Sequence, residues 1–180
     1  MPTETKIGLV LLRHPKWQQK SRLKNEEIEV FERFVAPFEG MVLSHIWRGY
    51  GSAIFLEFGN LRPKTKRDGS AGNPDGEMSA MIDCIWRIEN NMQINCGSSS
   101  DEALWEANFE DLLHQKVAEI SHFEKLHEIA ITFANGIRIL SFTANHGQPN
   151  WALFDRRNGE RVMSSISGKL VVDNHSIRSQ

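Results

Sequence analysis

Cysteine, tyrosine and long apolar runs are scarce in this chain. Its 180 residues include two cysteines and one tyrosine, which excludes the disulfide framework of a small secreted domain. No stretch approaches the roughly 18 consecutive apolar residues of a membrane-spanning helix. The longest apolar run, residues 7–12, is too short for a signal-peptide core, and its basic flank lies on the wrong side. We therefore expect a cytoplasmic protein with no membrane-spanning segment.

An excess of charge of one sign is also missing. The chain has 21 Lys and Arg against 23 Asp and Glu, a formal net charge of −2. This balance provides no overall attraction to an anionic membrane or to nucleic acid. Nucleic acid is therefore a disfavoured partner. Two basic stretches, residues 13–24 and 62–67, are local exceptions. The length predicts a single domain over residues 1–180.

What the chain does contain is a faint internal repeat. Residues 31–60 recur in altered form 75 positions later. In both copies an apolar-striped helical segment precedes strands of alternating pattern. We therefore predict an α+β, β-rich domain of two similar halves, about 25–97 and 98–173, that share one core. Residues 1–24 precede the halves as a basic segment. The correspondence pairs Phe34 with Phe109, Ile54 with Ile129, Leu56 with Ile131, and Asn60 with Asn135.

Two helices are predicted from apolar periodicity and from the residues at their ends. The first spans 26–36, where Pro37 disfavours any continuation. The second spans 101–114, where Ser99 and Glu102 have the spacing of a capping box. We expect both helices to cover faces of the sheets.

The strands are predicted from alternating apolar and polar positions. Residues 78–88 alternate without interruption and are predicted as one strand. In residues 127–143 the pair Asn135-Gly136 predicts a two-residue type I′ hairpin turn, which sets Ile131 opposite Leu140. Further short strands are expected near residues 151–155, 161–166 and 169–173.

A similar turn at residues 90–91 decides the relation between the two cysteines. A two-residue loop there places Cys84 and Cys96 on opposite faces of the sheet, so we favour free thiols. A three-residue loop would instead set the two cysteines opposite one another.

No motif in the chain supplies catalytic chemistry. Residues 49–52, Gly-Tyr-Gly-Ser, precede an alternating strand rather than a helix, so we interpret them as a hairpin turn and not as a phosphate loop. The seven histidines lack the short spacing of zinc ligands. Cys96, just before the second helix, is the better nucleophile candidate of the two cysteines. We assign no catalytic residue, no metal site and no cofactor.

Charged residues provide a candidate ligand site. Glu57 interrupts an apolar strand, and Asp83, Arg87 and Glu89 alternate along one face of the strand predicted from residue 78. We name these four as candidate ligand-binding residues. The same row is also typical of a solvated sheet face whose salt bridges each contribute little.

Contact surface is predicted at two tryptophans and at one insertion. Trp17 lies in the basic N-terminal stretch, and Trp47 is expected to point outward from its strand, so both are candidate partner-binding residues. Residues 60–77 form a long insertion predicted to lack regular structure. Such an insertion is typical of a functional or a disordered loop.

Five short blocks carry a family resemblance: residues 40–42, 49–52, 56–59, 86–89 and 151–154. The most specific are the Gly-x-Gly-Ser and Glu-Phe-Gly block together with Trp-Arg-Ile-Glu. Across roughly residues 38–156 the chain resembles small bacterial proteins of uncharacterised function. The resemblance implies a bacterial origin and a β-rich fold, and it implies no catalytic residue. In size and halved architecture the chain is also similar to small immunity-type proteins that neutralise toxins.

These observations favour a non-catalytic intracellular binding module with a protein partner, of which an immunity-like protein is the most concrete form. The alternative is a small-molecule-binding protein or hydrolase, with a cleft between the halves lined by Glu57, Asp83, Arg87 and Glu89. A third interpretation is a homodimer without a ligand.

Overall fold

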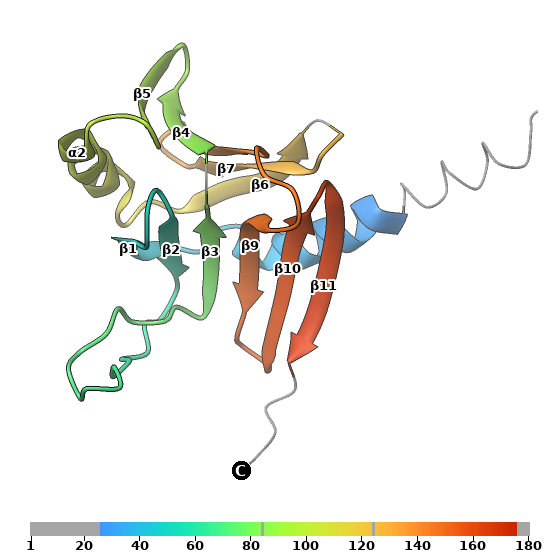
Figure 1. Ribbon diagram of the computed structural model, residues 1–180, viewed down its shortest axis with the longest axis horizontal. Coiled ribbons are helices and arrows are strands. Elements are labelled where there is room, and N and C mark those ends of the chain that lie inside the picture. The colour runs from blue at the N-terminus through green and yellow to red at the C-terminus, as the bar shows by residue number, and fades with distance from the viewer. Residues whose placement is uncertain (1–25, 84, 124, 176–180) are drawn as a thin grey trace, which may run out of the picture.

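The chain folds into a single β-rich α+β domain of two antiparallel sheets and two α-helices (Figure 1). The structure is a computed structural model that describes residues 26–83, 85–123 and 125–175. The basic segment 1–24, with Trp17, and Cys84 lie outside the described residues. Neither helix in the described part has the length and apolar character needed to cross a membrane.

The elements alternate between helices and groups of strands along the chain. In order they are the helix over residues 26–35, the 3-10 turn η1 (Ala36–Phe38), β1 (Leu43–Arg48), β2 (Ile54–Phe58), β3 (Met78–Ile82), β4 (Ile85–Asn90), β5 (Gln93–Gly97), α2 (Glu102–Leu112), β6 (Val117–Phe123), β7 (Glu128–Phe133), β8 (Ile137–Phe142), β9 (Pro149–Asp155), β10 (Glu160–Ile166) and β11 (Lys169–His175).

Each sheet combines strands from distant parts of the chain. The six-stranded sheet has the order β1-β2-β3-β9-β10-β11, and the five-stranded sheet has the order β5-β4-β8-β7-β6. The prediction of one strand over residues 78–88 is therefore wrong, because β3 belongs to one sheet and β4 to the other. The alternation nevertheless continues across the crossing, with Ala80 and Ile82 buried before it and Trp86 and Ile88 buried after it.

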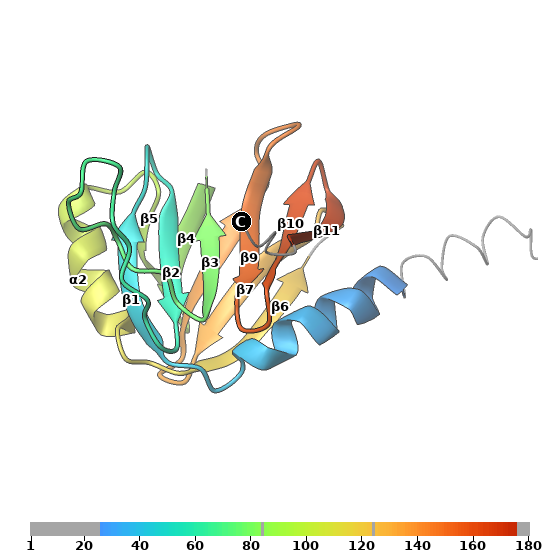
Figure 2. The same ribbon diagram turned by 90° about the horizontal axis from the view of Figure 1, so that it is seen from below.

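One hydrophobic core joins both sheets and both helices. Aromatic contacts connect its parts: the Trp86 and Trp105 rings lie 4.9 Å apart, and the Phe38 and Phe58 rings 5.5 Å apart. The two helices lie on opposite sides of the molecule (Figure 2). The largest fully buried side chains are Trp86, Trp151, Phe31, Phe38, Phe58 and Phe133.

The predicted helices are present with small differences at their ends. The capping box at Ser99 is wrong, because Asp101 is the N-cap residue and its carboxylate accepts from the Ala103 N–H at 3.0 Å. An acidic cap also interacts favourably with the positive end of the helix dipole. The helix ends at Leu112, two residues before the predicted end.

The hairpin of β7 and β8 is present, but its predicted register is wrong by one residue. Ile131 lies opposite Ile139, and Leu140 lies opposite Ala130. A type I′ turn requires positive φ at both central residues, and of Asn135 and Gly136 only the glycine has it, with φ +83°. The loop therefore has three residues, 134–136, in the form of a type I turn followed by a left-handed glycine.

The hairpin of β4 and β5 also turns one residue later than predicted, at residues 91–92. Ile88 lies opposite Cys96, and Glu89 opposite Ile94, so the chain bulges at Asn95. Cys96 is a buried free thiol. The glycine-rich segment 49–52 is a tight strand connection, as predicted, closed by a Gly49 N–H bond to the Ala53 carbonyl at 2.8 Å.

Candidate functional site

The insertion at residues 60–77 is an ordered arm that projects from the ends of β2 and β3 (Figure 1). Its two sides pair through reciprocal backbone hydrogen bonds between Arg62 and Asp75, at 2.8 and 3.0 Å. Further out, the Gly72 N–H donates to the Lys64 carbonyl at 2.7 Å. As predicted, the insertion contains no helix or strand, and its order comes from isolated bridges and turn hydrogen bonds. We call residues 62–75 the basic arm.

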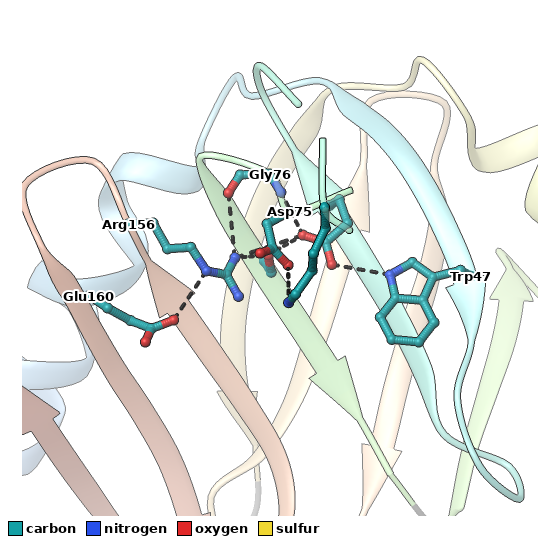
Figure 3. Close-up of polar contacts among 8 residues, drawn as sticks. Trp47, Asp75, Gly76, Arg156 and Glu160 are labelled. Atoms are coloured by element: carbon teal, nitrogen blue, oxygen red, sulfur yellow. Dashed lines mark hydrogen bonds and ion pairs between the residues drawn. The ribbon is translucent and has the colours of Figure 1, made fainter. Parts of the chain in front are cut away.

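A buried carboxylate lies where the basic arm meets the sheet. Glu57 is the fourth residue of β2, between Leu56 and Phe58, which both face the core. Alternation turns Glu57 toward the opposite, outer face of the sheet. Its side chain is nevertheless only 2% exposed, because Gly76, Trp47 and Arg156 surround it (Figure 3).

Every oxygen of Glu57 is engaged by a donor of the protein. Oε1 accepts from the Trp47 Nε1–H at 3.2 Å, and Oε2 accepts from the Gly76 backbone N–H at 2.8 Å. Oε2 also accepts from the Ser79 hydroxyl, and Nη1 of Arg156 lies 3.8 Å from the same oxygen. A buried carboxylate is tolerated when its charge is paired and its lone pairs are satisfied.

Arg156 lies in the turn from β9 to β10, next to β3 in the same sheet, and it contacts the residues around Glu57. Its Nη1 donates to the Ser79 hydroxyl and, at 3.4 Å, to the Gly76 carbonyl. Its Nε donates to Glu160 at 3.1 Å, and its guanidinium lies over the Phe154 ring at 5.0 Å. We call Trp47, Glu57, Gly76, Ser79 and Arg156 the anchor cluster, since together they hold the arm on the sheet.

The glycine in the anchor cluster is required by space. A Cβ at residue 76 would lie 2.7 Å from backbone atoms of Phe58 and Met78. Because backbone atoms of two strands cannot move apart cheaply, only glycine brings its N–H close enough to Glu57.

The partner-binding candidate Trp47 lies on the outer face of the six-stranded sheet, as predicted. Its ring is stacked on Phe55 with centroids 4.0 Å apart and planes 5° from parallel. The indole is half-buried, and its only donor is directed at Glu57. Trp47 therefore supports the anchor cluster as well as presenting apolar surface.

The four candidate ligand-binding residues do not form one group. Glu57 lies on the outer face of the six-stranded sheet, and Arg87 and Glu89 lie on β4 of the other sheet. Nε of Arg87 is 2.7 Å from Oε2 of Glu89, and Arg138 lies 3.6 Å from that carboxylate. Asp83 follows the last residue of β3, in the segment that connects the two sheets. Its backbone N–H donates to the Asn150 carbonyl at 2.9 Å.

A second group of charges lies beside the anchor cluster at the β9–β10 turn. Asp155 accepts from Arg157 Nε at 3.0 Å and from Arg161 Nη2 at 3.3 Å. The hydrogen bond from the Arg157 side chain is the main cause that holds the pKa of Asp155 below its ordinary value. Similarly, the Asn60 backbone N–H lowers the pKa of Glu77 at the base of the arm.

The chemistry of the anchor cluster is that of a buried structural contact and not of a reaction centre. The Ser79 hydroxyl is buried between a carboxylate and a guanidinium, and Glu57 has no accessible oxygen for a substrate. Among the residues that the structure describes, no group of three His, Cys, Asp or Glu side chains is arranged to hold a metal ion.

Sequence reasoning singled out Glu57 and Trp47 but missed Gly76, Ser79 and Arg156. The missed residues carry no local signal, since each is brought to Glu57 by pairing of β2 with β3 and of β3 with β9.

Comparison with known proteins adds no relative: no family model, no curated protein and no solved structure matches this chain. The resemblance to small bacterial proteins of uncharacterised function stays a prediction.

Proposed function

We propose that this protein is a non-catalytic binding module that recognises an acidic surface of a protein partner through its basic arm. An immunity-type protein that neutralises a toxin is the most concrete form of this proposal. The arm adds nothing to the hydrophobic core, because residues 61–71 are all exposed. Long ordered loops of this kind, held by a rigid scaffold, commonly serve binding.

Charge on the arm supports an acidic partner. Lys64 is paired with Asp75 across 3.0 Å, and the Asp68 carboxylate accepts from the Ser70 N–H and hydroxyl. Lys66 and Arg67, at the tip, make no ion pair with any residue in the described part of the chain. The arm carries four basic side chains and two acidic ones, Asp68 and Asp75, so it presents a net positive charge to the solvent.

The observation that carries the proposal is the burial of Glu57 under the arm. Removing a carboxylate from water is costly unless its partners compensate fully. Here the compensation includes the Gly76 N–H at the base of the arm, so the burial of this charge and the position of the arm depend on each other. A loop that is held in place in this way and exposes residues 61–71 is suited to a preorganised contact with a partner.

We also infer that the domain consists of two related halves, about 25–97 and 98–173. Each half then consists of a helix, a three-stranded meander and a hairpin. The hairpin of each half pairs with the meander of the other half. The sheet orders β1-β2-β3-β9-β10-β11 and β6-β7-β8-β4-β5 support this inference, since they match element by element except for the additional edge strand β11. Phe34 and Phe109, at equivalent helix positions, are both buried, and Ile54 and Ile129 are fully buried in β2 and β7.

If the two halves are compared, the basic arm is present in the first half only. The second half connects its equivalent strands by the three-residue turn 134–136 and has no arm. At the position equivalent to Glu57 it carries Thr132. The arm and its buried carboxylate are thus features of one half only, which supports a role beyond folding.

A photo-crosslinking residue placed at Lys66 tests the proposal in the source cell. We expect it to capture a specific protein, while the same residue at exposed Gln93 on the other sheet does not. With that protein purified, Lys66→Glu and Arg67→Glu should each weaken binding at least about tenfold, because each puts a negative charge in place of a positive one against the acidic partner. Lys125→Glu, a charge reversal far from the arm, should leave affinity unchanged.

Equal effects of Lys125→Glu and Arg67→Glu on affinity would contradict recognition by the arm. Capture of RNA or DNA at position 66, with no protein, would contradict the proposed class of partner.

A further inference from the structure

Sheet edges in this fold are protected against pairing, with one exception. Within the described residues the edge strands are β1 and β11 of one sheet and β5 and β6 of the other. The pairing register shifts within β1 near Ser44, within β5 near Asn95, and within β6 near Ala118. Bulges of this kind distort an edge and prevent another strand from adding to it.

Strand β5 has a further protection. Its Gly97 N–H donates to the Ser100 hydroxyl at 2.9 Å, and its Gly97 carbonyl accepts from Trp105 Nε1 at 2.9 Å. The chain that leads into α2 thus occupies the hydrogen-bonding groups at this end of the edge.

Strand β11 has neither protection. It pairs with β10 over seven consecutive residues, from Lys169 to His175, without a register shift. The connecting turn has two residues, Ser167 and Gly168, both with positive φ, so Lys169 forms the first hydrogen-bonded pair with Ile166. Alternation then directs the N–H and C=O groups of Leu170 and Val172 away from β10, toward the open edge of the sheet (Figure 1).

A hollow lined by apolar side chains and two arginines adjoins this edge. It has a volume of about 160 Å³ and is lined by Val172 and by Val30, Arg33 and Phe34 of the N-terminal helix, with Arg161 of β10. Val30 and Val172 are among the exposed large apolar residues, at 37% and 39%. The edge and the hollow together form a surface that lacks a neighbour in the described part of the chain.

We propose that a second copy of this chain pairs with β11 in antiparallel fashion, about a two-fold axis at Val171. The sequence Lys169-Leu170-Val171-Val172-Asp173 is complementary to itself in this register. Lys169 lies opposite Asp173 of the second copy, and Leu170 lies opposite its Val172. Two-fold symmetry repeats each contact, so the interface contains two ion pairs and an apolar centre.

The same register satisfies the backbone. Leu170 of one copy and Val172 of the other both direct their N–H and C=O groups outward, so they form hydrogen-bonded pairs. Val171 then faces Val171 of the second copy as a non-hydrogen-bonded pair. On the inner face, Leu170 of the second copy lies beside Val172 and adds apolar surface next to the hollow.

Sedimentation equilibrium of the full chain tests the proposal. We expect the mass to rise with concentration from 20.6 kDa to twice that value. Lys169→Asp and Asp173→Lys should each weaken the dimer about tenfold or more, because like charges then face each other twice. The double variant Lys169→Asp/Asp173→Lys should restore the dimer to within about threefold of the native constant. Ile94→Lys, on exposed β5, is the control and should change nothing.

Disulfide formation tests the register, in a Cys84→Ser background that retains buried Cys96. A non-hydrogen-bonded antiparallel pair has Cα atoms about 4.5 Å apart, which suits a disulfide. Val171→Cys should therefore form a covalent dimer under mild oxidation, much faster than Val172→Cys. The Cys84→Ser parent should form none.

Three results would overturn the proposal. A constant mass of 20.6 kDa at all accessible concentrations would show that no second copy binds. A dimer that survives both single charge reversals, or one that the double variant fails to restore, would place the interface elsewhere. Faster crosslinking of Val172→Cys than of Val171→Cys would exclude this register.

Discussion

The backbone N–H of Gly76 donates to Oε2 of Glu57 across 2.8 Å, and this bond ties the base of the basic arm to β2. Arg156 contacts both partners, since its Nη1 lies 3.4 Å from the Gly76 carbonyl and 3.8 Å from the Glu57 carboxylate. The contact between β2 and the arm is therefore reinforced by a residue from the β9–β10 turn.

Substitution of Glu57 should destabilise the protein. Glu57→Gln keeps the shape but removes the charge that pairs with Arg156, and it turns an NH2 group toward donors. We expect a loss of about 2–4 kcal/mol in the free energy of unfolding, measured by urea denaturation. Glu160→Gln removes the negative charge paired with the same arginine at a 38% exposed site and should cost less than about 1 kcal/mol. Equal losses for the two variants would show that burial of Glu57 has no energetic weight.

Removal of the basic arm should leave a folded protein. Residues 59–77 are replaced by Ala-Asn-Gly, the turn of the second half, and Glu57 by Thr, the residue at the equivalent position. We expect one cooperative urea transition with a loss of no more than about 2 kcal/mol, because the shorter loop lowers the entropy cost of closure. Binding to the partner captured at Lys66 should be abolished. A variant with no cooperative transition would show that the arm is needed for folding.

Acid should weaken the fold partly through Asp155. The hydrogen bond from Arg157 lowers the pKa of this carboxyl in the folded state, so the contribution is present at neutral pH. It is lost as the pH falls through the ordinary carboxyl range and then through the lowered folded-state pKa. Between about pH 5 and pH 2, the free energy of unfolding should fall more steeply for the native protein than for Asp155→Asn. Parallel curves for the two proteins would refute this assignment.

The Cys96 thiol should be unreactive in the folded protein. Burial raises the pKa of this thiol to about 11, and the attacking species is the thiolate. In a Cys84→Ser variant at pH 8, a disulfide reagent such as dithionitrobenzoate should react at least about a hundredfold more slowly with the folded than with the urea-unfolded protein. Comparable rates would mean that Cys96 is reached by solvent without unfolding.

Much of the fold is predictable because side-chain period is a local property. Alternation identified the buried residues of β2, and it identified those of β3 and β4 although these strands lie in different sheets. The error there has a physical cause: the period of two is unchanged when a strand leaves one sheet and enters another with the same face inward. Likewise, Asn135-Gly136 predicted a turn, while the conformation of Asn135 decided the register.

The candidate site was predictable only at its centre. Glu57 stands out as a carboxylate in an apolar strand, and Trp47 as an outward tryptophan. Grouping Glu57 with Asp83, Arg87 and Glu89 rested on the assumption that charged positions of one half converge. The structure instead separates Glu57 from Arg87 and Glu89 onto different sheets, and brings Gly76, Ser79 and Arg156 to the carboxylate.

Sequence by itself determined which side chains turn inward, where the two helices form, and that charge is balanced. These follow from spacing along the chain. Tertiary structure alone decided that Glu57, which alternation turns toward water, is buried, and that β11 is the edge without a bulge. Both depend on which distant segments pack together, and the free energy of burying a group is set by those neighbours in space.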